Sequence, residues 1–338
     1  MDVDAFLRSA LAEDLGDAGD ITSVATIPAD ARARAHVVAR AAGCIAGLDV
    51  ALRVFTLLDE RVRVERLQAP DVMAGTPGRA AGGSGTAGGG AGPAAGGSGT
   101  TEGGAGPAAG GSGTAGGGAG PAADRLVTIG DGSVVAAGTR LAVVDGPARS
   151  ILSAERLALN LLGHLSGIAT ATRALVDSIE GTRARIVDTR KTTPMLRALE
   201  KAAVRAGGGG NHRMGLYDAV LIKDNHVQAV GSVGAAVTRA RQAVGSDRPV
   251  SVEVEIDCLD DLEEAIAAGA DIILLDNMDL EVMRAAVERA AGRCLLEASG
   301  GITLETVREV AETDVDLISV GWITHSAPAL DVALDFEV

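Results

Sequence analysis

Six short apolar segments, separated by stretches of helical length, constrain the fold of the second half of this 338-residue chain more than any other feature. Each segment is a nearly continuous run of Val, Ile, Leu and Ala. Continuous apolar strands that alternate with helices are typical of a parallel sheet covered on its outer face. The pattern therefore predicts an α/β architecture, either a barrel or a doubly wound sheet. The expected strands are residues 184–187, 219–222, 250–254, 272–275, 294–296 and 317–320.

Polar residues or glycines follow the C-terminal end of each expected strand. In a barrel, and also in a doubly wound sheet, these strand ends and the loops after them form the active-site face. The order of the strands is therefore expected to bring cations and carboxylates into one cavity mouth. The residues collected in this way are Arg190, Lys191, Lys223, Glu255 and Asp276.

All three lysines of the chain lie between residues 188 and 226, and 27 of the 30 basic residues are Arg. Lys carries a compact point charge that the planar guanidinium of Arg does not replace, so lysines retained in such a composition point to a specific role. The net charge of the whole chain is −15, so this segment is a local concentration of cations. It predicts a site for a small anion. The same segment also contains Arg197, Arg205, His212, Arg213 and His226.

Two glycine-containing segments after the last two expected strands suggest a phosphate site. Ser299-Gly300-Gly301 precedes a helix expected to begin near Thr303, and Val320-Gly321-Trp322 precedes His325. Glycines allow backbone N–H groups to approach an anion, and a helix N-terminus adds a favourable dipole. Paired loops of this kind hold phosphate in many α/β barrels. Ordinary strand-to-helix turns are the alternative.

Several candidates also have a purely structural interpretation. Lys223 can be a solvated residue at a strand end, and Glu255 and Asp276 can be ion-pair partners at the mouth. His164 is expected to be a packing residue of its helix.

A helical stripe of three cations follows the first strand end. Arg197, Lys201 and Arg205 recur at i, i+4 and i+8, which places them on one helix face. We expect this face to be solvated or to form an interface rather than to bind a ligand. The glycines of 207–210 exceed what a helix C-cap needs, and are expected to turn the chain so that residues 211–213 return to the mouth.

The first half of the chain reads as a smaller α/β unit, with strands expected at 34–38, 62–67, 126–129 and 140–144 and a helix at 48–58. Residues 80–121 are three copies of a 14-residue Gly- and Ala-rich unit, which cannot bury enough apolar surface to order itself. We expect a disordered insertion there. A long helix is predicted from 150 to 179, because Leu157, Leu161 and Leu165 recur at i, i+4. The predicted domains are 1–149 and 150–338, with a C-terminal helix packed on the first.

Bulk properties exclude some classes of protein. The acidic balance argues against nucleic-acid binding, and the chain has no apolar run of about 18 residues that could span a membrane. Three scattered cysteines lack metal-ligand spacing, which fits the reducing cytoplasm.

A resemblance to a known family rests on segments spread along the chain. The segment at 188–226, DTRKTTPMLRALEKAAVRAGGGGNHRMGLYDAVLIKDNH, resembles the signature of quinolinate phosphoribosyltransferases, also called carboxylating nicotinate-nucleotide pyrophosphorylases. Further matching segments, in the family's order, are AEDLGDAGDITS, SAERLALNLLGHLSGIAT, VEVEID, ILLDN, LEASGGI and VGWITHS. The repeat block is the main departure from the family pattern.

The resemblance implies an N-terminal α/β sandwich domain, an incomplete, seven-stranded α/β barrel and a homodimer, or a higher oligomer, with shared active sites. It implies transfer of a phosphoribosyl group from phosphoribosyl pyrophosphate to quinolinate with Mg²⁺, releasing nicotinate mononucleotide, pyrophosphate and CO₂. Two carboxylates on the acceptor fit several cations and a bidentate Arg. A Schiff-base aldolase using Lys223, and a binding protein without turnover, are the alternatives.

Residue roles follow from the resemblance position by position. The quinolinate set is Arg156 from the neighbouring subunit, Thr189, Arg190, Lys191, His212, Arg213 and Lys223. The phosphoribosyl pyrophosphate set is Glu255, Asp276, Ser299, Gly300, Gly301, Val320, Gly321, Trp322 and His325. Glu255 and Asp276 are expected to hold Mg²⁺, directly or through water. Lys191, Lys223, Glu255 and Asp276 are the expected catalytic residues, with Lys191 or Lys223 orienting the carboxylate that is lost.

Overall fold

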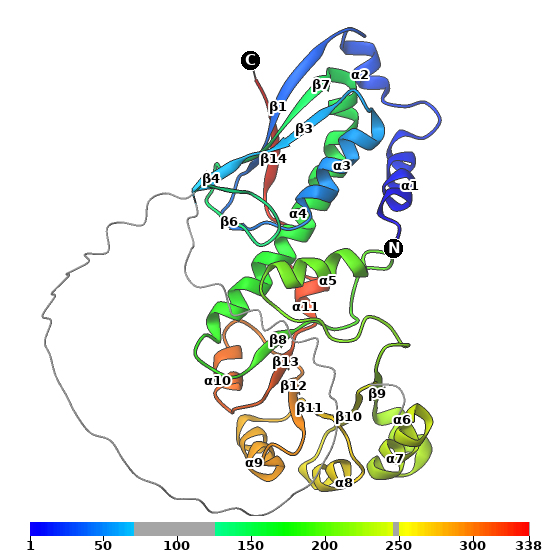
Figure 1. Ribbon diagram of the computed structural model, residues 1–338, viewed down its shortest axis with the longest axis vertical. Coiled ribbons are helices and arrows are strands. Elements are labelled where there is room, and N and C mark those ends of the chain that lie inside the picture. Colours follow the sequence, from blue (N-terminus) through cyan, green and yellow to red (C-terminus); the bar gives the residue numbers. More distant parts are fainter. Residues whose placement is uncertain (71–125, 246–249, 338) are drawn as a thin grey trace, which may run out of the picture.

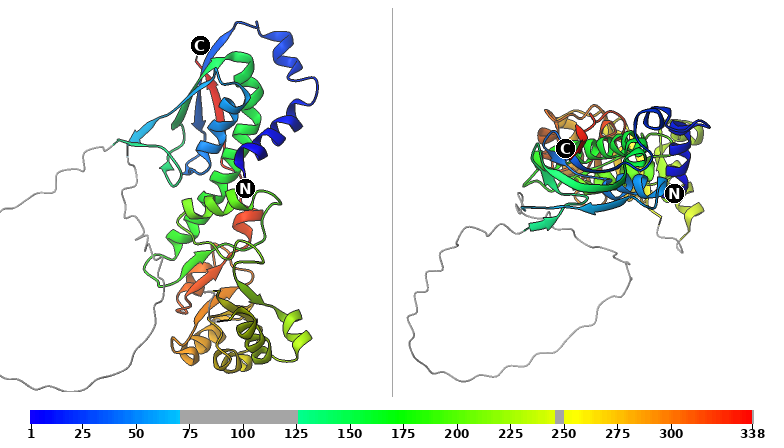
Figure 2. Two further views of the ribbon diagram at one scale, coloured as in Figure 1. Left: turned by 45° about the vertical axis from the view of Figure 1, so that its right-hand side comes forward. Right: turned by 90° about the horizontal axis from the view of Figure 1, so that it is seen from above.

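The structure is a computed structural model, and it describes residues 1–70, 126–245 and 250–337. The repeat block at 80–121 lies outside these ranges. The chain forms two parts in line, joined by one long helix, α4 (Ala148–Ser178) (Figures 1 and 2). None of the described helices combines the length and the apolar character needed to cross a bilayer.

The first part is built on a four-stranded antiparallel sheet in the order β14-β1-β7-β3, with α3 and α4 packed on one another beside it (Figure 1). The expected helix at 48–58 is confirmed by α3. The elements of this part are α1 (Val3–Leu15), α2 (Ile21–Thr26), β1 (Arg32–Ala39), β2 (Gly43–Cys44), α3 (Leu48–Leu58), β3 (Arg63–Arg66), β4 (Gln68–Pro70), β5 (Leu126–Thr128), β6 (Val134–Val135), β7 (Arg140–Pro147) and β14 (Val332–Phe336).

The C-terminal segment packs on the first part, as expected, but as a strand instead of the expected helix. β14 pairs antiparallel with β1, with His36 opposite Asp335. A segment this short cannot form a stable strand alone, and the edge of β1 supplies its hydrogen bonds. The end of the chain therefore completes the first sheet.

The second part contains a parallel sheet in the order β8-β13-β12-β11-β10-β9. All six expected strands are confirmed, with small shifts at their ends. The elements are β8 (Arg185–Val187), α5 (Arg197–Ala206), β9 (Val220–Ile222), α6 (Asp224–Val230), α7 (Val233–Val244), β10 (Val252–Ile256), the 3₁₀ turn η1 (Leu259–Asp261), α8 (Leu262–Ala267), β11 (Ile272–Asp276), α9 (Leu280–Ala290), β12 (Leu295–Ser299), α10 (Val307–Ala311), β13 (Leu317–Ser319) and α11 (Trp322–His325).

The number of strands differs from the expected seven. The described residues form six strands in this sheet, and β8 and β9 stand at its two edges. Beyond β8, the part of the chain that the structure describes has one further backbone bridge, from Val187 to Gly210. The glycine segment 207–210 packs tightly against α4. A β-carbon at Gly207 would lie only 2.4 Å from the carbonyl oxygen of Ala169 on that helix, so glycine is needed at this position.

Helix α4 belongs to the hydrophobic cores of both parts. Leu162 packs in the core of the first part, whereas Leu165 and Ile168 pack in the core of the second. Both cores consist almost entirely of aliphatic side chains, and Phe55 is the largest fully buried side chain among the described residues. One continuous helix thus fixes the two parts relative to each other.

Candidate functional site

A cavity of about 780 Å³ lies at the C-terminal ends of the parallel strands. All but one of the site residues expected from the sequence line it, and they come from the C-terminal ends of β10, β11 and β12 and from the segments that follow β8, β9, β12 and β13. The convergence predicted from strand order is therefore present in the structure. The lining residues are Thr189, Arg190, Lys191, His212, Arg213, Leu221, Lys223, Glu255, Leu274, Asp276, Asn277, Glu297, Ser299, Gly300, Gly301, Ile302, Thr303, Ser319, Val320, Gly321, Trp322 and His325.

Arg156 is the expected site residue that does not line this cavity. It lies on the exposed surface of α4, which at this level packs with the first part of the molecule. Its own chain therefore does not bring it to the other residues.

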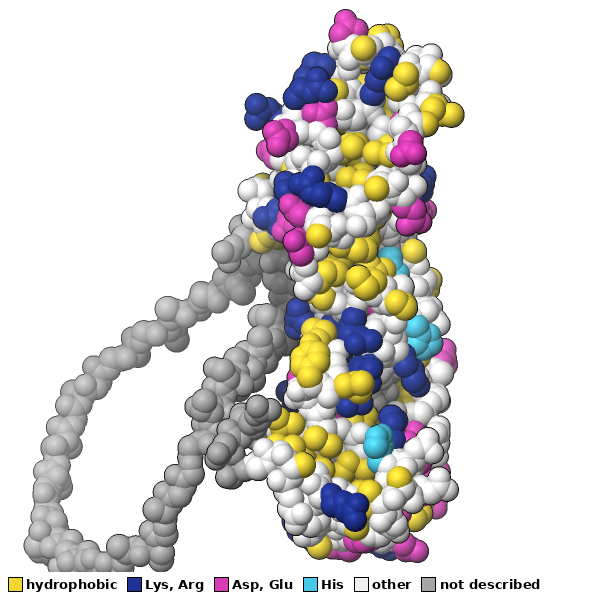
Figure 3. Space-filling view, turned by 90° about the vertical axis from the view of Figure 1, so that its right-hand side faces the viewer, with side chains coloured by type: hydrophobic (Ala, Val, Ile, Leu, Met, Phe, Trp, Pro, Cys, Tyr) yellow, Lys and Arg dark blue, Asp and Glu magenta, His cyan; other side chains and the backbone are white. Residues whose placement is uncertain are grey.

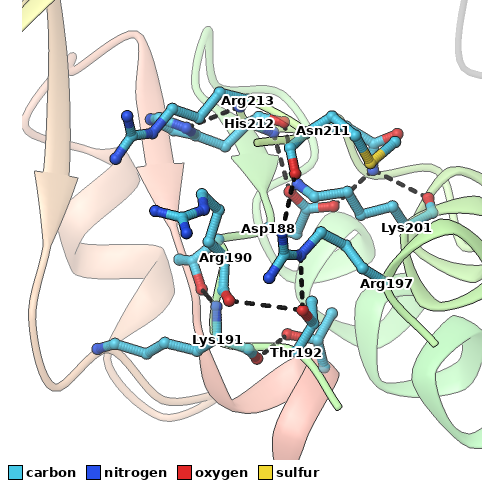
Figure 4. Close-up of polar contacts among 12 residues, drawn as sticks. Asp188, Arg190, Lys191, Thr192, Arg197, Lys201, Asn211, His212 and Arg213 are labelled. Atoms are coloured by element: carbon cyan, nitrogen blue, oxygen red, sulfur yellow. Dashed lines mark hydrogen bonds and ion pairs between the residues drawn. The ribbon is translucent and has the colours of Figure 1, made fainter. Parts of the chain in front are cut away.

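Two arginines face the cavity with part of their hydrogen-bonding capacity unused. The Nε atoms of Arg190 and Arg213 are buried, and neither has a hydrogen-bond partner among the described residues. Burial, and then the charge of Arg190, lower the pKa of Arg213 below its ordinary value. Their guanidinium groups point to the same side as the Lys191 ammonium (Figure 4). Figure 3 shows a group of Lys and Arg side chains just below the middle of one face of the molecule, with others on its upper part. An anion between Arg190 and Arg213 would satisfy both groups.

Lys223 and Glu255 form an ion pair at the cavity, with 2.5 Å between Nζ and Oε2. About half of the Lys223 side chain is exposed, while Glu255 is mostly covered. Lys223 is therefore not simply a solvated residue at the end of β9. Glu255 takes part in an ion pair at the mouth, which was the structural alternative considered for it from the sequence. The pair places a positive and a negative group at the same point of the lining.

Asp276 ends β11 and accepts a hydrogen bond of 3.0 Å from the side chain of Asn277. Asn277 has a left-handed backbone (φ 53°), and its N–H donates to the carbonyl oxygen of Ser299. This turn brings the Asp276 carboxylate next to the glycines that follow β12.

Side chains join the segment after β13 to the glycine loop after β12 and to the loop after β8. The indole N–H of Trp322 donates to the carbonyl oxygen of Ile302 at 3.0 Å, and the hydroxyl of Thr324 donates to the carbonyl oxygen of Lys191 at 2.8 Å. A β-carbon at Gly321 would lie 3.0 Å from Cδ of Lys191. Glycine at this position thus allows the lysine to lie against the loop.

The helix expected near Thr303 begins later, at Val307. Residues 304–306 form a turn, and the N–H of Thr303 donates to the hydroxyl of Thr306. The dipole of this helix therefore does not act directly at Gly300 and Gly301, so backbone N–H groups of the loop are the groups left to hold an anion.

His212 lines the cavity, but both of its ring nitrogens are used inside the protein. Nδ1 accepts a hydrogen bond from the N–H of Arg213 at 2.8 Å, and Nε2 lies 2.8 Å from a carboxylate oxygen of Glu253. Burial lowers the pKa of His212, but the hydrogen bond to Glu253 and the nearby carboxylates outweigh it and raise this pKa overall.

Glu253 and Glu297 are buried carboxylates that the sequence analysis did not assign to the site. Burial and the charge of Glu253 raise the pKa of Glu297 to about 7. Together with His212 they place three possible metal-ligand atoms within 4.8 Å of one another. Because Nδ1 of neutral His212 accepts a hydrogen bond, Nε2 carries the proton and has no lone pair for a metal. We therefore interpret this cluster as a hydrogen bond between His212 and Glu253 beside the buried carboxyl group of Glu297, whose two oxygens have no hydrogen-bond partner among the described residues.

Two of the lining residues that were not predicted, Leu274 and Glu297, could have been found from their positions in the sequence. Glu297 and Leu274 each stand two residues before a predicted strand-end residue, Ser299 and Asp276. Residues two apart in a strand point to the same face, so these side chains share the inward face with the predicted ones. Glu253 stands in the same relation to Glu255.

The helical stripe on α5 differs most from the prediction. Lys201 is completely buried and forms an ion pair with Asp188, which is also completely buried. Only Arg205 of the stripe is classed as exposed. His164, expected to be a packing residue, is partly exposed and lies 2.9 Å from the buried Glu200.

Comparison with known proteins gives matches along nearly the whole chain. Residues 168–335 match the family model described as quinolinate phosphoribosyl transferase, C-terminal domain. Residues 20–78 and 122–166 match the model of the N-terminal domain of the same family. The interruption of the second match, 79–121, coincides with the repeat block.

Individual relatives agree with these matches. The carboxylating nicotinate-nucleotide pyrophosphorylase of Mycobacterium leprae is 40% identical over 336 residues, which cover 97% of this chain and 95% of that protein. The probable enzyme of the same name from Bacillus subtilis is 52% identical over 190 residues, which cover 56% of this chain and 65% of that protein. The solved structure of NadC from Streptococcus pyogenes is 36% identical, with a TM-score of 0.76 and coverage of 99% of this chain and 97% of that one. The nicotinate-nucleotide pyrophosphorylase structure from Francisella tularensis is 34% identical, with a TM-score of 0.77 and coverage of 99% and 96%.

Proposed function

Because this chain belongs to the quinolinate phosphoribosyl transferase family, we infer that it is a carboxylating nicotinate-nucleotide pyrophosphorylase of de novo NAD biosynthesis. It joins quinolinate to the phosphoribosyl group of phosphoribosyl pyrophosphate and releases nicotinate mononucleotide, pyrophosphate and CO₂. The observation that carries the assignment of the cavity is the pair of inward arginines, Arg190 and Arg213, whose buried Nε atoms have no partner among the described residues.

Quinolinate occupies the cationic side of the cavity in this proposal. Its two adjacent carboxylates meet Arg190 and Arg213, with Thr189 and Lys191 beside them. Charge-assisted hydrogen bonds to carboxylates are about twice as strong as neutral ones, so two such contacts favour a dicarboxylate over nicotinate. His212 does not bind the substrate through its ring nitrogens, since both have partners inside the protein. It positions Arg213 instead, by accepting a hydrogen bond from the Arg213 N–H.

The phosphoribosyl group lies on the opposite side. The quinolinate ring nitrogen attacks the anomeric carbon as pyrophosphate leaves, and positive charge develops on the sugar. Glu255 and Asp276 stabilise this charge because they line the same cavity. The backbone of Gly300, Gly301 and Gly321 approaches the phosphate oxygens, with Ser299, Val320, Trp322 and His325 around them.

Mg²⁺ fits the donor set of this side. It commonly takes one or two protein carboxylates together with substrate phosphates and waters, and Glu255 and Asp276 offer two carboxylates. The ion would neutralise charge on the leaving pyrophosphate. Glu255 is already paired with Lys223, so an ion held by Glu255 would compete with Lys223 for this carboxylate.

Loss of the 2-carboxylate as CO₂, followed by uptake of a proton at the ring carbon that carried it, completes the reaction. It leaves an electron pair beside a ring nitrogen that has become cationic, which lowers its energy. Lys191 or Lys223 orients the departing carboxylate. Lys223 is the more closely held of the two, through Glu255, whereas the Lys191 ammonium has no ion-pair partner among the residues drawn with it in Figure 4.

The finer fold and assembly belong to the same proposal. We propose that the parallel sheet acts as an incomplete barrel whose seventh segment is the backbone at Gly210, and that the first part is the α/β sandwich domain. A homodimer brings Arg156 of a second copy to the cavity. The protein acts in the cytoplasm.

The decisive assay measures CO₂ release from quinolinate labelled at the 2-carboxylate, with phosphoribosyl pyrophosphate and Mg²⁺. We expect turnover that stops when EDTA is added, and little product when nicotinate replaces quinolinate. Equal use of nicotinate would contradict the two-carboxylate site, and binding without CO₂ release would indicate a non-enzymatic relative. Lys223→Ala with wild-type turnover would exclude a part for Lys223.

Shared sites can be tested separately by mixing two inactive variants. Arg156→Ala and Lys223→Ala should each lose activity. A mixed dimer contains one site with both Arg156 and Lys223 intact, so unfolding and refolding the two variants together should restore about a quarter of the wild-type activity if subunits pair at random. No recovery would argue against a contribution of Arg156 from a neighbour.

A further inference from the structure

The buried pair of Lys201 and Asp188 lies directly behind the cavity. Among the ion pairs of the described residues it is the one in which neither side chain has any exposed surface. Lys201 comes from α5, and Asp188 is the first residue after β8. Neither residue lines the cavity, so neither touches a substrate there.

The pair holds the backbone of His212 at both of its polar groups. Nζ of Lys201 donates to the carbonyl oxygen of His212 at 2.9 Å, and the N–H of His212 donates to Oδ1 of Asp188 at 2.9 Å. The preceding residue is held as well, because the side-chain amide of Asn211 donates to Oδ2 of Asp188 and to the carbonyl oxygen of Lys201. Figure 4 shows these contacts converging on Asp188 and Lys201.

The two residues thereby connect the two loops that carry the cavity arginines. Asp188 precedes Arg190 by two residues, and His212 is bonded directly to Arg213. His212 also fixes the N–H of Arg213 through Nδ1, at 2.8 Å. The relative position of Arg190 and Arg213 thus depends on one buried ion pair and the peptide groups that it holds.

Net stabilisation does not explain the pair. Burial lowers the pKa of Lys201 and raises the pKa of Asp188, so the protein interior disfavours both charges. Replacing a buried ion pair by neutral groups of similar size is often neutral or stabilising, whereas removing one partner is costly. What the pair provides, and apolar side chains would not, is directional hydrogen bonding to the loop at 211–213.

We propose that Lys201 and Asp188 are positioning residues for dicarboxylate recognition: they fix the separation of the Arg190 and Arg213 guanidinium groups across the cavity. This inference rests on the proposed function and extends it. A ligand with two adjacent carboxylates needs both arginines at a set spacing, whereas a ligand with one carboxylate needs only one of them. Loosening the loop at 211–213 therefore lowers affinity for the dicarboxylate more than affinity for the monocarboxylate.

The test compares Lys201→Met with the double variant Asp188→Asn/Lys201→Met. For Lys201→Met we expect the KM for quinolinate to rise about tenfold or more, with the KM for phosphoribosyl pyrophosphate changed less than about twofold. The preference for quinolinate over nicotinate should fall. The double variant leaves no unpaired buried charge, so its thermal midpoint should return towards that of the wild type while the KM for quinolinate stays high. If the single variant does not fold, the double variant carries the test.

Leu175→Ala is the matched control for loss of stability alone. Leu175 lies on α4, is completely buried in the hydrophobic core of the second part, and does not line the cavity. It should lower the thermal midpoint and leave both KM values unchanged. The proposal is overturned if Lys201→Met alters both KM values equally, or if Leu175→Ala raises the KM for quinolinate as much.

Calorimetry with phthalate, a benzene 1,2-dicarboxylate, and with benzoate separates this proposal from the proposed function. A wild type without CO₂ release would contradict the function. Phthalate binding that weakens about tenfold in the double variant, with benzoate binding unchanged, would still support positioning. Equal phthalate binding by wild type and double variant would overturn it, and so would a wild type that binds phthalate no more tightly than benzoate.

Discussion

Gly300 lies so close to Asn277 that a β-carbon at position 300 would be 2.1 Å from Oδ1 of Asn277. The backbone of Gly300 is also left-handed, with φ of 98°. The loop after β12 and the turn after β11 can therefore approach each other only with glycine at this position. This contact sets the Asp276 carboxylate beside the glycine loop, so the expected ribose and phosphate contacts depend on it.

Gly300→Ala should reduce kcat/KM for phosphoribosyl pyrophosphate at least tenfold, because Asn277 must move to make room. The left-handed backbone adds about 1 kcal/mol of strain. Gly269→Ala is the control, since Gly269 has φ of 88° and the nearest atom to its β-carbon would be 3.9 Å away. It bears a similar backbone cost without the collision. Equal loss of activity in both variants would show that strain alone is responsible.

Arg213→Lys should raise the KM for quinolinate about tenfold or more, with a much smaller effect on phosphoribosyl pyrophosphate. A lysine keeps the charge but loses the planar fork that binds a carboxylate through two parallel bonds, worth about 1.5–3 kcal/mol. Steady-state kinetics with each substrate varied in turn will measure the effect. Arg239→Lys on the exposed side of α7 should change neither KM. An unchanged KM for quinolinate in Arg213→Lys would remove Arg213 from the carboxylate site.

Glu297→Gln should make the stability of the protein less dependent on pH. The pKa of Glu297 is about 7 in the folded protein and 4.5 as its ordinary value, so the folded state holds a proton that the unfolded state releases between these values. Wild-type stability from this group therefore falls as pH rises from about 4.5 to 7 and is lost above that. Gln cannot ionise, so the stability of the variant relative to wild type should increase over the same window.

Thermal midpoints at pH 5, 6, 7 and 8 will measure this difference. The cost of burying the amide of Gln is the same at each pH and does not affect the slope. Glu309→Gln, at an exposed position of α10, is the control and should follow the wild type. A constant difference between Glu297→Gln and wild type across the range would mean that Glu297 is ionised throughout.

Gly167→Ala should destabilise the protein and should loosen the C-terminal segment. A β-carbon at Gly167, in the middle of α4, would lie 2.2 Å from the carbonyl oxygen of Pro328. The obstacle is backbone, which cannot turn away, and overpacking of this kind typically costs about 1–3 kcal/mol or more. Chemical denaturation will measure the stability, and amide exchange of β14 will report the loosening.

Gly234→Ala provides the comparison within a helix, on α7. Its β-carbon would meet the flexible Glu264 side chain at 2.6 Å, which can move aside. Ala also favours a helix over Gly by about 1 kcal/mol, so this variant should be close to neutral. Similar destabilisation of both variants would show that the loss of glycine itself, and not the contact with Pro328, is the cause.

Much of the fold follows from local sequence patterns. Continuous apolar runs identified all six parallel strands, and the helices at α3 and α4 were placed within two residues of their observed ends. The candidate site followed from the same register, because strand ends that carry polar residues meet at one edge. Nearly every residue assigned in this way lines one cavity.

The errors share a physical cause. The spacing of Arg197, Lys201 and Arg205 shows that they lie on one helix face, but only packing decides whether another element covers that face. The segment at β14 is too short to show its own preference, and it becomes a strand because the edge of β1 is available. Buried Glu253 and Glu297 resemble ordinary acidic residues until the neighbouring strands enclose them.

The sequence by itself determined the family, the parallel α/β architecture and the identity of the cations and carboxylates at the site, since these depend on periodicity and on residue type. Only the tertiary structure decided that Lys201 is buried against Asp188, that His212 faces Glu253, and that Arg156 stands apart from the cavity of its own chain. The role of a charged residue cannot be predicted from its sequence position alone, because burial determines whether the same ammonium group is solvated or holds two loops together.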